Sequence, residues 1–331
     1  MAPTEVVFFN GHKMPIVGLG TWQSNEADVA KALDAALEAG YRHIDTAYLY
    51  QNEAAIGRTL RKWFDSGKLK REDLFIVTKL PLIGNKAECV EKYLKRSLTS
   101  LQLRYVDLYL IHHPVGLLEK GEELWPTSED GNLMVDNNTD HLNLWKAMEA
   151  QVDAGRARSI GLSNFSSRQV KRIVQNCRIQ PANLQIELHV YFQQRELAAF
   201  CRALDISVCA YAPLGSPGLV EFLKNRGTDT SSVPSLSPMS DPVVKKIAQK
   251  HKRTPAQVLL RHIIERGIVV IPKSINPNRI KENINIFDFE LTEEDEQELN
   301  ALEKGSAARM FSDRAANRFL GHPENPFADR Y

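Results

Sequence analysis

The sequence has 331 residues, of which 43% are hydrophobic and 25% are charged, and its formal net charge is +1. This composition is typical of a soluble globular protein, and the small net charge excludes a chain built for nucleic acid or an anionic membrane. No basic stretch precedes a long apolar run, so we expect neither a secretion signal nor a transmembrane segment. The four cysteines lack metal-binding or redox spacing, which favours a cytoplasmic protein with reduced thiols.

The chain begins with a predicted β-hairpin. Apolar residues at 5–9 and 13–16 flank Asn10-Gly11, and Asn-Gly between apolar runs is the strongest short hairpin signal. From residue 17 onward, short apolar runs alternate with amphipathic stretches of helical period. The expected strands are 17–20, 43–45, 75–78, 108–112, 159–162, 184–187, 207–211 and 269–272. The expected helices include 27–39, 52–64, 86–101, 139–154, 167–176 and 194–204.

This alternation predicts a fold of the α/β class. Apolar strands that alternate with helices favour parallel pairing with right-handed crossovers, and eight such units close naturally into a (β/α)8 TIM barrel. A barrel of this kind routinely reaches this length as one domain, so we expect a single domain over residues 1–331. The hairpin precedes the first unit and is expected to plug the bottom of the barrel. We see no reason to expect more than a monomer.

Three long stretches, at 115–138, 214–240 and 303–331, do not fit the repeat and are rich in Gly, Pro, Ser or Asn. The first two follow the expected fourth and seventh strands, and the third follows the last helix. Loops after barrel strands lie on the C-terminal face, where barrel active sites are found. We therefore interpret all three as walls or lids of a substrate pocket, built from irregular loops.

Four polar residues lie at or just past the ends of expected strands: Asp45, Tyr50, Lys79 and His112. If the strands are parallel neighbours, these side chains converge at one barrel mouth. A carboxylate, a phenol, an amine and an imidazole in one pocket form a proton-transfer site. Each of the four alone has an ordinary structural role, so the prediction depends on their occurring together.

Several motifs occur in order along nearly the whole chain. They are GLGTW at 18–22, the segment from 45 to 50, TKL at 78–80, DLYLIH at 107–112, IGLSNF at 160–165, YAPLG at 211–215 and IPKS at 271–274. This pattern resembles the aldo-keto reductase superfamily. The resemblance implies a (β/α)8 fold, NADPH as cofactor and reduction of aldehydes or ketones to alcohols.

The four strand-end residues suit that reaction, which places a hydride on carbon and a proton on the developing alkoxide. A tyrosine phenol normally titrates near pH 10, and a nearby ammonium such as Lys79 favours the phenolate. We therefore expect Lys79 to lower the pKa of Tyr50, the general acid in reduction. Asp45 is expected to orient Lys79 and keep it charged, and His112 to hydrogen-bond the carbonyl oxygen.

The resemblance also implies a cofactor site. Ser163, Asn164 and Gln185 match positions that bind the nicotinamide carboxamide, and Tyr211 matches the residue that stacks on its ring. Thr21 and Trp22 border the same pocket. The cofactor set further includes Pro213, Leu214, Ser216, Ile271, Lys273, Ser274, Arg279, Glu282 and Asn283. Within this set, Lys273 and Arg279 lie near an expected helix start and suit the 2′-phosphate of the adenosine. They therefore favour NADPH over NADH.

The expected substrate pocket is mostly apolar. It comprises Trp22, Leu49, His113, Trp125, Met310 and Phe311. Pro81 and His113 stand where aldose-reductase-like members often carry tryptophan, and Trp125 is expected to restore an aromatic wall. Gly218 stands where some relatives place an acidic latch over the pyrophosphate, so faster NADPH release is our hypothesis. Such a pocket suits a hydrophobic carbonyl compound.

Several alternatives follow from the same residues. The chain is similar to insect members that reduce the 3-keto group of ecdysteroids, and a general aldehyde reductase fits equally well. A cofactor-binding regulatory subunit without significant turnover, as in potassium-channel β subunits, is the alternative class. His112-His113 lacks an evident third metal ligand, so we expect no metal site. Gln23 occupies the third glycine position after Gly18 and Gly20, which excludes a Rossmann fold.

Overall fold

Eight parallel strands form the main sheet of the computed structural model, which describes residues 2–225, 227, 230–231, 233–234, 236–311, 319 and 321–327. They are β3 (Leu19–Gly20), β4 (His43–Asp45), β5 (Phe75–Leu80), β6 (Val106–Ile111), β9 (Ala157–Ser163), β10 (Asn183–Glu187), β11 (Ser207–Tyr211) and β12 (Val269–Val270). Neighbouring strands pair in chain order from β3 to β12. All the pairs within this sheet are parallel.

The first and last strands of this sheet also join. Gly18 donates its N–H to the Val270 carbonyl at 2.8 Å, and Val270 donates to the Ile16 carbonyl at 2.8 Å. Parallel bridges pair Val17 with Val270 and Gly20 with Lys273. The sheet therefore closes on itself, which leaves no open edge, and the predicted (β/α)8 barrel is confirmed.

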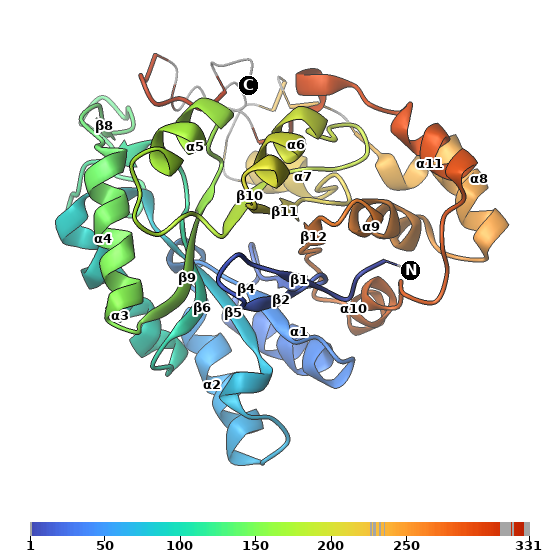
Figure 1. Cartoon of the computed structure of the whole chain (residues 1–331), viewed down its shortest axis with the longest axis horizontal. Helices are drawn as coiled ribbons and strands as arrows, with labels where there is room; N and C mark the ends of the chain where they lie inside the picture. The colour runs from blue at the N-terminus through green and yellow to red at the C-terminus, as the bar shows by residue number, and fades with distance from the viewer. Residues whose placement is uncertain are drawn as a thin grey trace.

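Helices surround the strands on the outside (Figure 1). They are α1 (Glu26–Glu38), α2 (Glu53–Asp65), α3 (Ala87–Leu101), α4 (His141–Asp153), α5 (Ser167–Val174), α6 (Arg195–Ala203), α7 (Leu219–Asn225), α8 (Pro242–His251), α9 (Pro255–Glu265), α10 (Pro277–Ile284) and α11 (Glu293–Asn300). Asp140 starts α4 by accepting the N–H groups of Leu142 and Asn143 with its side chain. Gly40 and Gly155 follow the ends of α1 and α4 with positive φ angles, a conformation that glycine adopts readily after a helix.

The N-terminal hairpin consists of β1 (Glu5–Val7) and β2 (Lys13–Pro15), which pair in antiparallel fashion. Figure 1 shows both strands lying across the barrel. The turn residue Asn10 donates to the Ser159 hydroxyl at 3.0 Å, and the Phe8 ring meets Phe75 edge-on at 5.9 Å. Phe75 and Ser159 lie at the N-terminal ends of β5 and β9. The hairpin thus covers the bottom of the barrel, as expected.

The long stretches are more regular than we expected. The first contains an antiparallel pair, β7 (Gly116–Leu117) and β8 (Val135–Asp136), and the second contains α7 and the 3₁₀ turn η4 (Pro238–Ser240). A further 3₁₀ turn, η5 (Gly305–Ala308), begins the third. These short elements lie within the three predicted long loops, and parts of the second and third lie outside the described residues. The first two follow β6 and β11, on the C-terminal face.

Burial explains why the strands read as continuous apolar runs. Every residue of β5 and of β6 is buried, because one face packs inside the barrel and the other packs against helices. A charged side chain in such a strand is costly unless it is paired. Lys79 in β5 is therefore a residue that needs a partner.

Among the described residues, no helix combines the length and the apolar character needed to cross a membrane.

Candidate active site

The four strand-end residues meet at the C-terminal mouth of the barrel. Asp45 ends β4, Tyr50 ends the 3₁₀ turn η1 (Tyr48–Tyr50), Lys79 lies one residue before the end of β5, and His112 directly follows β6. The parallel register places neighbouring strand ends at the same level. The sequence identified the residues, and the fold supplies the common mouth that brings them together.

Lys79 is the centre of this group. Its Nζ donates to Asp45 Oδ1 at 2.6 Å, to the Thr46 carbonyl at 2.9 Å and to the Tyr50 hydroxyl at 3.3 Å. These are all the hydrogen bonds that an ammonium can donate. Burial lowers the pKa of Lys79, but Asp45 and Tyr50 outweigh that effect and the net direction is upward. Lys79 therefore remains an ammonium ion at neutral pH.

The pKa of Tyr50 moves in the opposite direction to our expectation. Burial raises this pKa and Asp45 adds to the rise, whereas Lys79 lowers it without reversing the net direction. The expected influence of Lys79 is present, but desolvation of the phenolate is larger. Tyr50 consequently keeps its proton at neutral pH, which is the state that a proton donor needs.

His112 lies beside Tyr50, and the two rings meet edge-on with centroids 5.6 Å apart. Burial lowers the pKa of His112 well below its usual value, and the charge of Lys79 contributes in the same direction. Its imidazole is thus neutral at physiological pH and can donate one hydrogen bond to a carbonyl oxygen. Within the described part of the chain, His112 Nδ1 is buried without a hydrogen-bond partner.

The residues predicted for the nicotinamide are connected to the same group. Gln185 donates to Asp45 Oδ2 at 2.8 Å, so Asp45 binds Lys79 with one oxygen and Gln185 with the other. Asn164 donates from Nδ2 to the His112 carbonyl at 3.0 Å and to the Ser163 hydroxyl at 3.2 Å. Asn164 also donates its backbone N–H to the Gln185 carbonyl at 3.0 Å, so a single hydrogen-bonded network joins the ends of β4, β5, β6, β9 and β10.

Tyr211, at the end of β11, extends this network. Its hydroxyl donates to Asn164 Oδ1 at 2.8 Å, and its ring meets Phe311 edge-on at 5.4 Å. Thr21, next to β3, is buried and donates its hydroxyl to the Asp45 carbonyl at 2.9 Å. Both residues thus lie at the mouth, as the motif pattern predicted.

The other predicted cofactor residues lie on two neighbouring segments. After β11, Pro213 is buried, Leu214 is partly buried, and Ser216 has a φ of 43° and accepts the N–H of Leu219 at 3.0 Å. After β12, buried Ile271 donates its N–H to the Ala210 carbonyl at 3.2 Å.

A group of polar residues lies around the start of α10. Lys273 and Arg279 are exposed, and within the part of the chain that the structure describes neither forms an ion pair. Ser274 accepts the N–H of Asn276, the N-cap of α10, at 3.1 Å. Glu282 accepts the Thr254 hydroxyl at 2.7 Å. Asn283, unlike Lys273 and Arg279, is buried.

Three of the predicted pocket residues, Trp22, Met310 and Phe311, pack in one apolar group. Trp22 meets Phe311 edge-on at 5.4 Å and meets Phe222 of α7 at the same distance. Met310 is buried with Leu219 in the small core against which Trp22 and Phe311 pack. The second and third long stretches therefore converge on Trp22.

The other predicted pocket residues lie on the main core. Leu49 and Trp125 are partly buried against it. His113 is buried, and its Nδ1 accepts the Val115 N–H at 3.1 Å. Its ring lies 4.8 Å from that of Phe319, and burial lowers its pKa to about 3. His113 therefore acts in this structure as a neutral packing residue.

Glu187 is a site residue that the sequence reasoning did not single out. This buried carboxylate ends β10 and accepts the N–H groups of Met310 at 2.6 Å and Phe311 at 2.9 Å. It attaches the third long stretch to the barrel mouth. The sequence feature that could have identified Glu187 is its position as an acidic residue at the end of an expected strand, two residues after Gln185.

Asn52 is a second missed residue. It is buried and donates from Nδ2 to the Thr21 carbonyl at 2.9 Å and to the Ser24 carbonyl at 3.1 Å. It also accepts the Thr46 hydroxyl at 3.1 Å. Thr46 supplies the backbone carbonyl that accepts a hydrogen bond from Lys79. No local pattern marks these contacts, because they connect three separate loops.

Comparisons with known proteins agree with this geometry. Residues 16–304 match the family model described as Aldo/keto reductase family. The chain is 42% identical to Aldo-keto reductase family 1 member A1 of Gallus gallus, with 98% of each chain covered. It is 43% identical to Dihydrodiol dehydrogenase 3 of Bos taurus, with 97% of each covered. A solved aldose reductase from Schistosoma japonicum shares 42% identity, full coverage of both chains and a TM-score of 0.87.

The chain belongs to the aldo/keto reductase family. It is an oxidoreductase, and its relatives support the reduction of small carbonyl compounds.

Proposed function

We propose that this protein reduces aldehydes or ketones with NADPH, and that Tyr50 is the general acid. The observation that supports this most directly is the contact of Lys79 Nζ with both Asp45 and the Tyr50 hydroxyl. It connects a proton donor to a buried ammonium, and the neutral imidazole of His112 lies alongside. When bound, NADPH supplies the hydride that these residues do not provide.

Proton transfer is the task of this chain's own residues. Tyr50 keeps its proton until negative charge develops on the substrate oxygen, and then donates it. The ammonium of Lys79, held by Asp45, stabilises the phenolate that remains. His112 donates a hydrogen bond to the same oxygen and fixes its position relative to Tyr50. In alcohol oxidation the roles reverse, and the phenolate becomes the base.

The residues at α10 fit a cofactor with a 2′-phosphate. Lys273 and Arg279 are exposed cations without ion-pair partners in the described chain, and Arg279 lies in the first turn of the helix. Helix N-termini and guanidinium groups both favour phosphate. Ser163, Asn164 and Gln185 would hold the carboxamide of the nicotinamide, and Tyr211 would stack on its ring.

Replacing Arg279 should change the KM for NADPH and leave the KM for NADH nearly unchanged. We expect Arg279→Ala to raise the KM for NADPH by roughly 10-fold or more, because a charge-assisted contact to phosphate is lost. The KM for NADH, which lacks that phosphate, should hardly change. Steady-state kinetics with both cofactors test this, and an equal change for both would refute phosphate recognition by Arg279.

Gly218 bears on how the cofactor leaves. No described atom lies within 4 Å of a Cβ added there, so a side chain can start at this position without a clash at Cβ. We expect Gly218→Asp to slow NADPH release by restoring an acidic group over the pyrophosphate. Stopped-flow fluorescence measures this rate. If the wild type releases NADPH as slowly as latched relatives do, the hypothesis of fast release is wrong.

The aromatic cluster of Trp22, Phe222 and Phe311 supports a hydrophobic substrate. We infer that the 3-keto group of an ecdysteroid and a general aldehyde are the two leading candidates. The function is tested by NADPH oxidation with a panel of aldehydes, sugars, quinones and ketosteroids. Turnover supports the proposal and its pattern identifies the substrate class. Tight NADPH binding with no turnover across the panel would favour the regulatory-subunit alternative.

We further propose that residues 1–331 form one barrel domain that works as a cytoplasmic monomer. Continuous pairing from β3 to β12 supports the single domain. All four cysteines are free thiols in the structure, which suits a reducing compartment. Size-exclusion chromatography with light scattering tests the oligomeric state.

A further inference from the structure

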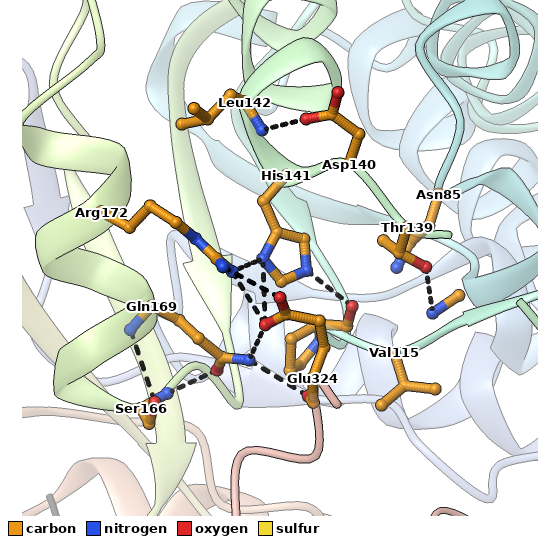
Figure 2. A network of polar contacts seen from close by, with 12 residues as sticks. Asn85, Val115, Thr139, Asp140, His141, Leu142, Ser166, Gln169, Arg172 and Glu324 are labelled. Atoms are coloured by element: carbon orange, nitrogen blue, oxygen red, sulfur yellow. Dashed lines mark hydrogen bonds and ion pairs between the residues drawn. The ribbon is translucent and has the colours of Figure 1, made fainter. Parts of the chain in front are cut away.

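Residues 321–327, here called the C-terminal clasp, attach to α5 through the carboxylate of Glu324 (Figure 2). Arg172 donates from Nη1 to Oε1 at 2.9 Å and from Nη2 to Oε2 at 2.8 Å. Gln169 donates from Nε2 to Oε2 at 2.9 Å and to the Glu324 carbonyl at 3.1 Å. A guanidinium fork on a carboxylate fixes orientation as well as distance, so the clasp has a defined position.

We propose that Glu324 is a positioning residue for the carbonyl-reduction site. Through its two partners on α5 it holds the chain segments that carry His112 and Asn164. The inference rests on the proposed function, in which His112 binds the substrate carbonyl and Asn164 binds the nicotinamide. Two separate series of hydrogen bonds, referred to below as the first and second chains, lead from the clasp to these two segments of the polypeptide.

The first chain passes through His141. Arg172 Nη2 lies 2.6 Å from His141 Nδ1, and a guanidinium can only donate, so Nδ1 is the acceptor. The proton of this histidine is therefore on Nε2, which donates to the Pro114 carbonyl at 2.7 Å. Burial lowers the pKa of His141, which agrees with a neutral ring. Pro114 is two residues after His112, so the clasp determines where the chain leaves β6.

The second chain passes through the start of α5. Gln169 Oε1 accepts the Ser166 N–H at 3.0 Å, and Ser166 lies two residues after Asn164. Asn164 has a φ of 64°, a left-handed conformation that a non-glycine residue keeps only with support from its surroundings. Asn164 Nδ2 donates to the His112 carbonyl at 3.0 Å. The two chains therefore meet again at the barrel mouth.

The clasp also holds the residue between His112 and Pro114. The ring of Phe327 in the clasp lies 6.1 Å from the ring of His113, and the ring of Phe319, which precedes the clasp, lies 4.8 Å from it. Buried His322 donates from Nε2 to the Asp136 carbonyl at 3.0 Å, which attaches the clasp to β8. All three residues that follow β6 are thus in contact with the clasp or with the network that it anchors.

The central ion pair is shielded from solvent but can be reached from one side. The side chain of Glu324 is 14% exposed and that of Arg172 is 34% exposed. Although burial raises the pKa of Glu324, hydrogen bonds from Arg172 and Gln169 lower it to about 2. The clasp is therefore charged at neutral pH. A cavity of about 360 Å³, lined by residues 137–142 and by Arg172, lies beside the pair.

Glu324→Ala and Glu324→Gln test the proposal, with Asp153→Asn as the matched control. Asp153 forms an exposed ion pair with Arg178 at the end of α4, remote from the clasp. We expect Glu324→Ala to lower kcat about 10-fold with the Kd for NADPH unchanged, because small misplacements of reacting groups are costly. Glu324→Gln, which keeps an acceptor for Arg172, should lose less. A lowered Tm with unchanged kcat in both Glu324 variants would show a merely structural role and overturn the proposal.

Added acetate gives a second test, because the cavity leads to Arg172. Acetate at increasing concentration should restore kcat in Glu324→Ala by occupying the vacated anion position. It should not do so in Glu324→Ala/Arg172→Met, where the cation is missing. Recovery in the single variant alone supports the proposal, whereas equal recovery in both, or recovery in neither, contradicts it.

Histidine NMR separates failure of this inference from failure of the proposed function. In ¹⁵N-histidine-labelled wild type, His141 should show the Nε2–H tautomer. Glu324→Ala should change the resonances of His112 as well as those of His141, and this readout needs no turnover. An unchanged His112 signal overturns the positioning role even if the wild type reduces no carbonyl compound. Absence of turnover alone would overturn only the proposed function.

Discussion

Tyr50→Phe should reduce carbonyl turnover by roughly 10²–10⁴-fold, the usual contribution of a positioned general acid. The substitution removes the hydroxyl that Lys79 contacts at 3.3 Å and leaves the ring in place. Lys79 keeps its bonds to Asp45 and to the Thr46 carbonyl, so the buried cation stays paired. Binding of NADPH should therefore remain nearly intact, and fluorescence titration measures it alongside kcat.

Tyr48→Phe is the matched control for this experiment. Tyr48 lies in the same 3₁₀ turn, but its hydroxyl contacts Arg96 at 3.3 Å and its ring packs on Tyr93. Loss of that hydroxyl should leave kcat close to the wild-type value. If Tyr50→Phe retains full activity, or if both variants lose the same amount, Tyr50 is not the proton donor.

The periodic spacing of apolar residues predicted most of the barrel strands. Where a predicted strand boundary was wrong, the error has a physical cause. The predicted strands at 43–45 and 207–211 agree with β4 and β11. The prediction ended β5 at residue 78 because Lys79 interrupts the apolar run, whereas the strand continues through Leu80. A strand can include this lysine because Asp45, which is 34 residues away, pairs with it. Tertiary pairing of this kind has no local signature in the sequence.

The same limit applies to the candidate site. Strand ends and motifs led to the four central residues, whose positions the fold then related to one another. Glu187 was missed because its partners, Met310 and Phe311, are more than 120 residues away. The predicted direction of the Tyr50 pKa shift was wrong because the shift depends on burial. The charged residues along the sequence do not reveal how deeply the phenol is buried. Contacts between distant loops and the extent of desolvation required the three-dimensional structure.

Lys79→Met should abolish reduction and also destabilise the protein, for two different reasons. Activity falls because the phenolate of Tyr50 loses its stabilising cation. Stability falls because Asp45, whose side chain is 2% exposed, is left as a buried charge without its partner. Breaking a buried pair in this way costs about 3–5 kcal/mol. Lys246→Met is the control, since Lys246 is 64% exposed in its pair with Glu298 and the loss of an exposed pair should change stability far less.

The double variant Asp45→Asn/Lys79→Met separates the two effects. It removes both charges, and the side-chain oxygen of the introduced asparagine can still accept the Gln185 hydrogen bond that Asp45 Oδ2 accepts at 2.8 Å in the wild type. Urea unfolding should therefore show a free energy of unfolding well above that of Lys79→Met alone. Activity should stay abolished, because no ammonium lies next to the phenol. Recovered turnover in the double variant would show that Lys79 serves only to neutralise Asp45, and the proton-transfer mechanism would then have to work without it.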